Sequence, residues 1–198
     1  MSEILDKKIN NHLGLEKNKI QIILTHTSRK ADDYLIGLRY RHNKRYNKLP
    51  HYIITNEGIV LQTMDDENYG RFFNNQTYDK QSIIVSLENL GWLEKEPLKK
   101  HHINWIGSIY KGKVVDKKWR DYFFWEQYKK VQLDMTAKLC KEISRKFEFE
   151  PICIGHNTKT NHMETFSGII SRSNIDEDAT DLSPAFDFDY FIKKLEDE

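Results

Sequence analysis

The chain has 198 residues, of which 31 are basic and 30 acidic, so its formal net charge is only +1. This length is typical of one domain with a substantial core, and the balanced charge gives no general reason to expect nucleic acid or an anionic membrane as a partner. No apolar run approaches the roughly 20 residues that a membrane helix needs, and the N-terminus lacks the apolar core of a signal peptide. We therefore expect synthesis in the cytoplasm without a signal peptide, with Cys140 and Cys153 as reduced thiols.

The first part of the chain contains an apolar run that ends at a histidine. Residues 1–18 are polar with scattered apolar side chains, and we expect them to form an N-terminal arm that packs on the domain. Residues 20–26 are rich in β-branched side chains and predict a buried strand. His26 stands at the end of this strand, where sites are often placed. It is either a histidine hydrogen-bonded within the fold or part of a functional site.

A helix and a hairpin are expected next. The stretch from Asp32 to about Asn47 predicts a helix whose basic residues form either a solvated face or a phosphate-binding face. Residues 51–55 and 59–63 predict the two strands of a β-hairpin, because a short turn with a glycine joins them. Residues 64–80 are polar and turn-rich, which favours a surface loop.

A second apolar strand ends at a carboxylate. Residues 82–88 predict this strand, with Val85 and Leu87 on one face and Glu88 on the other. An acid at the end of an otherwise apolar strand is either an ion-paired structural group or part of a site. Glu88 is therefore a second candidate for function.

The second half of the chain is less regular. Residues 94–120 favour an irregular excursion with a small hairpin. Residues 121–147 predict a long helix, because apolar side chains recur at steps of three and four. Residues 152–155 predict a short strand that ends at His156. Residues 157–180 are polar and turn-rich.

The predicted strand ends bring four polar groups to one region. An acidic turn at Asp181 precedes a last helix, predicted for residues 189–195. If the strands of one sheet end on the same side, His26, Glu88, His156 and Asp181 come together there. Two neutral imidazoles and one carboxylate leave a zinc ion a fourth position for water, as in catalytic zinc sites.

The sequence resembles the zinc-dependent N-acetylmuramoyl-L-alanine amidases of the type-2 amidase and peptidoglycan-recognition-protein family, which includes amidase-type phage lysozymes. Five segments carry the resemblance, in the order ILTHTS, PHYIITNEGIVLQ, SIIVSLENLGWL, IGHNT and TDLSPAFDFDYF. No single segment is specific, but their order is. The resemblance implies an α/β fold with a central mixed sheet flanked by helices, formed as a single amidase domain by residues 1–198.

The resemblance also implies roles for individual residues. His26, His156 and Asp181 match the three zinc ligands, and Glu88 matches the catalytic glutamate. His51, on the hairpin, matches a histidine near the metal or the substrate. The alternative for His51 is a histidine packed within its strand.

The spacing of the last two ligands departs from the family pattern. As many as 25 positions separate His156 from Asp181, and a shorter step is usual in the family, so residues 157–180 are interpreted as an inserted loop. His162, inside this loop, is the reserve candidate for the second ligand. Another alignment would place that ligand near Ser171-Arg172-Ser173, where the chain has no histidine.

Two further positions depart from the pattern. Many members have a lysine two residues before the aspartate, where this chain has Ala179, so Lys159 or Arg172 would supply the positive charge. The catalytic glutamate aligns with Ser86 in one register and with Glu88 in the other. Glu88 is preferred, because a serine cannot serve as the base.

The function implied is hydrolysis of the amide bond between N-acetylmuramic acid and L-alanine in peptidoglycan. Zinc would lower the pKa of its water to about 7, Glu88 would accept the water proton, and Lys159 or Arg172 would stabilise the oxyanion. Tyr69, Trp92 and Trp105 are candidates for stacking on sugar or peptide. We expect a monomer that acts on the bacterial cell wall after release through a membrane pore or a secretion system.

Other functions stay open at this point. Proteins of this fold can bind wall fragments without cutting them when the metal site is incomplete, so a non-catalytic peptidoglycan-binding protein is the alternative. A nucleic-acid-binding module would depend only on the basic residues between 39 and 48. A recycling amidase in the cytosol and an injected toxin are further variants of the amidase interpretation.

Overall fold

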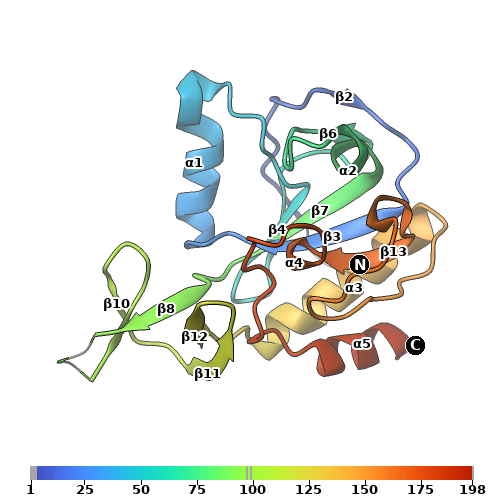
Figure 1. Cartoon of the computed structure of the whole chain (residues 1–198). Helices are drawn as coiled ribbons and strands as arrows, with labels where there is room; N and C mark the ends of the chain where they lie inside the picture. Colours follow the sequence, from blue (N-terminus) through green and yellow to red (C-terminus); the bar gives the residue numbers. More distant parts are fainter. Residues whose placement is uncertain (1–3, 97, 99, 198) are drawn as a thin grey trace.

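The computed structural model describes residues 4–96, 98 and 100–197, and its centre is a six-stranded sheet (Figure 1). The strand order is β1-β5-β4-β7-β3-β13. The strands are β1 (Ile4–Asp6), β3 (Gln21–His26), β4 (Tyr52–Ile54), β5 (Val60–Gln62), β7 (Ser82–Leu87) and β13 (Gly168–Ser171). Strand β3 pairs in parallel with β7 and β13, β7 pairs in parallel with β4, and β4 and β5 form an antiparallel hairpin. The predicted mixed sheet is thereby confirmed.

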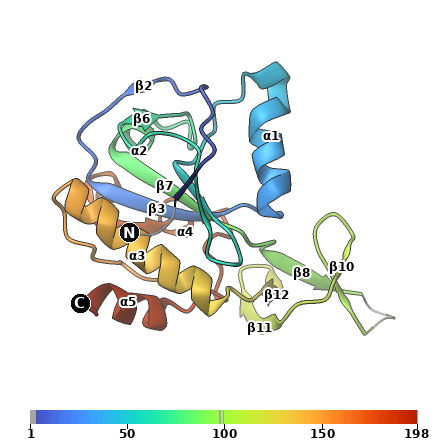
Figure 2. The ribbon, with the colours of Figure 1, turned by 180° about the vertical axis from the view of Figure 1, so that it is seen from behind.

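Helices cover both faces of this sheet. The helices are α1 (Ala31–Lys44), α2 (Gln76–Gln81), α3 (Lys130–Lys146), α4 (Arg172–Ile175), α5 (Phe188–Glu196) and the 3-10 turn η1 (Met163–Thr165). Figure 2 shows α3 crossing the sheet, with α5 beside it. Neighbouring side chains of a strand point to opposite faces of the sheet. Ile54 therefore belongs to the same buried cluster as Leu133 of α3, and Ile53 to the same buried cluster as Leu35 of α1.

A second sheet extends from the end of β7 (Figure 1). It has the order β10-β9-β8-β12-β11. Its strands are β8 (Trp92–Lys95), β9 (His102–Ile103), β10 (Ile109–Tyr110), β11 (Val114–Trp119) and β12 (Tyr122–Glu126), and a separate pair joins β2 (Gly14–Leu15) to β6 (Asn68–Tyr69). The second sheet therefore stands beside the edge at which β3 and β7 end.

Most predicted elements are confirmed. The surface loop expected over residues 64–80 contains β6 and most of α2 instead, and two further predictions are wrong. The predicted helix over residues 121–147 begins only at Lys130, because residues 122–126 form β12 and pair with β8 and β11. Phe124 and Tyr128 are four residues apart, as on one face of a helix, but β12 ends between them at Glu126.

The predicted strand at residues 152–155 is reduced to one bridge between Cys153 and Ile169. Its place next to β3 is taken by β13, which lies inside the stretch expected to be a polar insertion. The β-branched pair Ile169-Ile170 after a glycine is the signal that the sequence interpretation passed over.

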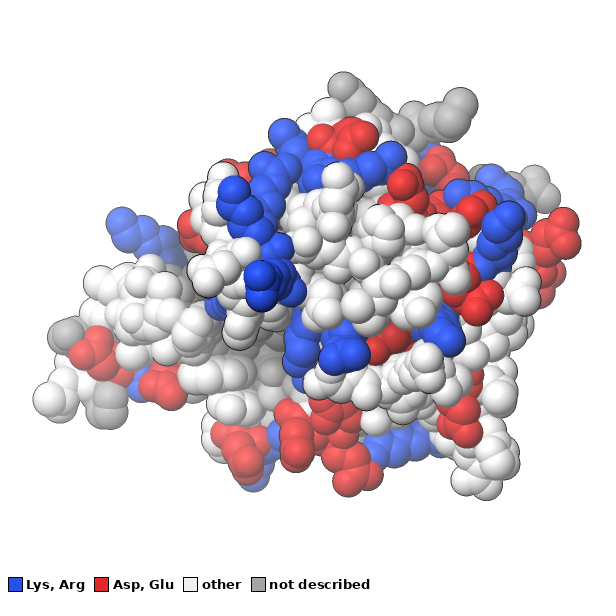
Figure 3. All heavy atoms as spheres, turned by 90° about the horizontal axis from the view of Figure 1, so that it is seen from above, with Lys and Arg blue, Asp and Glu red and all other residues white. Residues whose placement is uncertain are grey.

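The surface carries charges of both signs. On the face seen in Figure 3, Lys and Arg side chains form a narrow row between uncharged and acidic side chains. Among the described residues, no helix has the length and apolar character needed to cross a membrane.

Candidate functional site

The end of β3 meets the turn that carries Asp181. The Asp181 side chain is almost completely buried, and its Oδ2 accepts hydrogen bonds from the Thr25 hydroxyl and, at 3.3 Å, from the backbone N–H of His26. Its Oδ1 lies 3.8 Å from the Arg172 guanidinium. Both carboxylate oxygens therefore have partners from the protein itself.

The His26 ring contacts Tyr128 and Gly91. Its Nδ1 is 3.4 Å from the Tyr128 hydroxyl. A Cβ at Gly91 would come within 2.8 Å of its Cε1 and 3.2 Å of its Nε2, so the backbone of Gly91 covers that edge of the ring. Burial lowers the pKa of His26, the Asp181 carboxylate opposes this shift, and the Arg172 charge adds to it. His26 is accordingly a neutral imidazole at neutral pH.

His156 lies in a turn and packs between aromatic side chains. Its ring centroid is 4.6 Å from that of Trp119 and 5.5 Å from that of Phe188. Burial, reinforced by the charges of Lys117 and Arg120, lowers its pKa to about 4. Its Nε2 is buried and has no hydrogen-bond partner among the described residues. This neutral ring has a free ligand atom.

The three predicted zinc ligands do not form a metal site in this arrangement. Imidazole and carboxylate are donor types that zinc accepts, and the free Nε2 of His156 suits it. Within the described part of the chain, however, no three His, Cys, Asp or Glu side chains gather closely enough to hold a metal ion. His26 and Asp181 meet through a backbone N–H, and Asp181 is already occupied. The arrangement therefore does not fit a zinc ion with three protein ligands.

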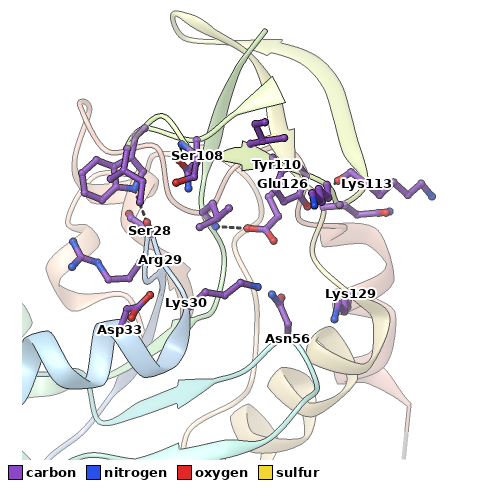
Figure 4. Close-up of a pocket in the computed structure, with 18 of the residues that line it drawn as sticks. Ser28, Arg29, Lys30, Asp33, Asn56, Ser108, Tyr110, Lys113, Glu126 and Lys129 are labelled. Carbon is purple, nitrogen blue, oxygen red and sulfur yellow. Dashed lines mark hydrogen bonds between the residues drawn. The ribbon is translucent and has the colours of Figure 1, made fainter. Parts of the chain in front are cut away.

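A groove of about 990 Å³ opens between α1 and the second sheet (Figure 4). Lys30, Asn56, Trp105 and Glu126 are among the residues that line it. Glu88 is not itself a lining residue but contacts two of them: its Oε1 is 3.3 Å from the Lys30 ammonium, and its Oε2 accepts a hydrogen bond of 3.1 Å from the Asn56 backbone N–H. The Glu88 side chain is only 8% exposed, and these two partners satisfy its buried oxygens.

Glu126 is a second buried acid of this groove that the sequence interpretation missed. It ends β12, and one of its oxygens accepts a hydrogen bond from the Leu90 N–H. Burial raises the pKa of Glu126, and the negative charge of Glu88 acts in the same direction, whereas Lys30 opposes it. In Figure 4 the Lys30 side chain points between Asn56 and Glu126. Glu126 is not recognisable as a site residue in the sequence, because the apolar spacing of residues 121–147 predicts one continuous helix there.

The other predicted site residues are spread over the molecule. His51 is fully buried between backbone groups: its Nε2 is 2.9 Å from the Asn68 carbonyl oxygen, and its Nδ1 accepts from the Ile84 N–H at 3.0 Å. Tyr69 lies on β6, and Trp92 stacks on Tyr122 with ring centroids 4.7 Å apart.

None of His51, Tyr69 and Trp92 is among the described residues that line the groove, whereas Trp105 does line it. The Trp105 Nε1 donates to the Ser28 carbonyl at 2.7 Å. Contacts of these residues with a substrate stay predictions.

The cations and the reserve ligand of the 157–180 stretch also have defined places. Lys159 pairs with Glu177 on the surface. His162, the reserve zinc ligand, has an exposed side chain 3.7 Å from Glu164. Arg172, the other predicted cation, follows β13 directly and contacts Asp181.

Comparisons with known proteins agree with the fold. The LysCS endolysin, an N-acetylmuramoyl-L-alanine amidase from Clostridium intestinale, aligns over 100% of this chain and 98% of its own, with a TM-score of 0.60 and 10% identity. The E. coli amidase AmiD, solved with anhydro-N-acetylmuramic acid-L-Ala-D-gamma-Glu-L-Lys, aligns over 91% of this chain and 58% of its own, with a TM-score of 0.56 and 14% identity. AmpDh3 from Pseudomonas aeruginosa, solved with anhydromuramic pentapeptide, aligns over 91% and 61%, with a TM-score of 0.53 and 10% identity.

The sequence itself gives the family. No curated protein sequence matches the chain. The sequence model described as N-acetylmuramoyl-L-alanine amidase matches residues 16–165, which is most of the chain and includes His26, Glu88 and the groove. Arg172 and Asp181 lie outside the matched residues. The chain therefore belongs to the N-acetylmuramoyl-L-alanine amidase family, a family of amide hydrolases.

Proposed function

We propose that the chain binds muramyl peptides of peptidoglycan in the groove and hydrolyses the amide bond between N-acetylmuramic acid and L-alanine. The observation that carries this proposal is the buried Glu88, which contacts the groove residue Lys30 and acts electrostatically on the groove residue Glu126, in a chain of the amidase family. Two solved neighbours of the same fold hold muramyl peptides, which supports this class of ligand. The place of action is the bacterial cell wall.

Each polar group of the groove has a part in the proposed reaction. Glu88 accepts a proton from the attacking water, and Lys30 and the Asn56 N–H hold its carboxylate in position. Lys30 carries the positive charge nearest to Glu88 and stabilises the oxyanion that forms from the scissile carbonyl. Glu126, whose pKa burial raises, lies near Glu88 and relays this proton to the leaving amine.

The predicted cofactor is zinc, with His26, His156 and Asp181 as its predicted ligands. Zinc supplies a polarised water and a Lewis acid where it is bound. Because these three side chains do not converge, we assign no step of the reaction to a metal ion. Parallel assays with added zinc and with EDTA test this part of the proposal.

The experiment compares wild type with Glu88→Gln on purified cell walls, by measuring the free amino groups of L-alanine that are released. We expect Glu88→Gln to lose about 10²–10⁴-fold in rate while the protein stays folded. The matched control is Glu57→Gln, an exposed acid on the neighbouring hairpin turn that pairs with Lys129, and it should keep the wild-type rate. A Glu88→Gln protein that cleaves at the wild-type rate would remove the assigned base.

A second candidate function is peptidoglycan binding without cleavage. The specific observation in its favour is the occupied carboxylate of Asp181, which has Thr25, the His26 N–H and Arg172 as partners. A wild-type protein that pulls down with cell walls and releases no amino groups, with or without zinc, would establish this function in place of the first.

A further inference from the structure

The position of Arg172 follows from the pairing of two strands. Strand β13 pairs in parallel with β3, with Ser171 opposite Leu24. Parallel neighbours end at the same edge of a sheet, so the residue after Ser171 emerges next to Thr25 and His26. Arg172 is that residue, and the sequence has no histidine at this edge of β13.

Two acids hold the Arg172 side chain in place. Its guanidinium donates to an Asp176 carboxylate oxygen at 3.0 Å, one helical turn ahead, and lies 3.8 Å from Asp181 Oδ1. The backbone fixes the same contact, because the Ser173 N–H donates to the Asp181 carbonyl at 2.6 Å. The positive charge is therefore built into the turn that carries Asp181.

A divalent cation at Asp181 would have to compete with this arrangement. It would have to displace the Thr25 hydroxyl and the His26 N–H from Oδ2, or stand next to the guanidinium at Oδ1. Like charges at such short range repel, and the hydrogen bonds lost would leave buried donors without partners.

We propose that the Arg172 guanidinium takes the place of the predicted metal ion next to Asp181, so that this turn is complete and stable without zinc. The proposal departs from the zinc ligand set that the family resemblance implies. It does not depend on the proposed function, because metal content and stability are measured without any substrate.

The first test is the metal content of the full chain, dialysed against excess zinc and then freed of unbound metal. We expect less than stoichiometric zinc, the same residual amount in wild type and in Asp181→Asn, and no change of the unfolding midpoint with added zinc or EDTA. Stoichiometric zinc in wild type that disappears in Asp181→Asn would overturn the proposal.

The second test is a double-mutant cycle between Arg172→Gln and Asp181→Asn, read as unfolding midpoints. We expect the two shifts of the unfolding midpoint to be non-additive, because each variant removes the same ion pair. Arg172→Lys keeps a positive charge, so its midpoint should fall less than that of Arg172→Gln. The control cycle pairs Arg172→Gln with Asp178→Asn, an exposed acid of the same turn, and should be additive. Additive shifts in the Asp181 cycle would overturn the assignment of Arg172 as its cation, whatever the enzyme does with cell walls.

Discussion

Replacement of Asp181 by alanine tests the contact that ties the C-terminal turn to the end of β3. Thr25 is 1% exposed, and its hydroxyl would lose its acceptor, as would the backbone N–H of His26. Each buried donor left without a partner costs about 1–3 kcal/mol, so the two together cost about 2–6 kcal/mol. The ion pair with Arg172 adds about 0.2–1 kcal/mol, because that side chain is 40% exposed and partly screened by solvent.

The assay is urea unfolding followed by far-UV circular dichroism and tryptophan fluorescence. We expect Asp181→Ala to lower the urea midpoint without changing the denaturant slope, and to lower Tm by roughly 5–20 °C in thermal unfolding. Asp181→Asn should lose less stability, because one acceptor oxygen remains. The exposed Asp178→Ala should change stability by no more than about 0.5 kcal/mol. If Asp181→Ala were as stable as this control, the carboxylate would not hold the turn, and the account of this site would be refuted.

Three further predictions concern the contact of Gly91 with the His26 ring, the acid stability due to His51, and ligand binding by Trp105 in the groove. Gly91→Ala should lower the free energy of unfolding more than Gly107→Ala does. Both glycines have a positive φ, so each variant loses about 1–3 kcal/mol to backbone strain, but only at Gly91 does the added Cβ also meet His26. Equal losses in urea unfolding would show that Gly91 does not cover the ring. Burial lowers the pKa of His51 to about 3, so below pH 6.5 the unfolded state binds a proton that the folded state excludes, and stability should fall by about 2 kcal/mol from pH 7 to pH 5. His51→Gln should flatten that pH dependence, and an unchanged slope would assign the acid sensitivity to other groups. Trp105→Ala should weaken binding of a muramyl peptide about tenfold by calorimetry, as the loss of about 1.4 kcal/mol of stacking predicts, whereas Phe123→Ala, an exposed aromatic outside the groove, should bind as wild type does.

The central part of the sheet was predictable because its strands are locally distinctive. Residues 20–26 and 82–87 are continuous apolar runs rich in β-branched side chains, which suit strands buried on both faces. The turn Asn56-Glu57-Gly58 between two apolar segments marked the hairpin of β4 and β5. These elements fix the positions of His26 and Glu88 at one edge of the sheet.

The site was less predictable, because its partners come from non-local contacts. The sequence indicated His156 as a strand-end residue next to His26, but the strand that pairs with β3 is the short β13, and Arg172 follows it. Glu126 was hidden by the coincidence of helical spacing across β12. Which carboxylates meet which cations depends on strand order, and local patterns do not determine strand order.

Cleavage of the amide bond between N-acetylmuramic acid and L-alanine is measured most directly by mass spectrometry of the products formed from a muramyl-L-alanyl peptide. We predict two new species, free N-acetylmuramic acid and a peptide that begins with L-alanine, in wild type and not in Glu88→Gln. A ligand that binds in the groove and is recovered intact would contradict the claim, and cleavage at a sugar–sugar or peptide–peptide bond would contradict it equally.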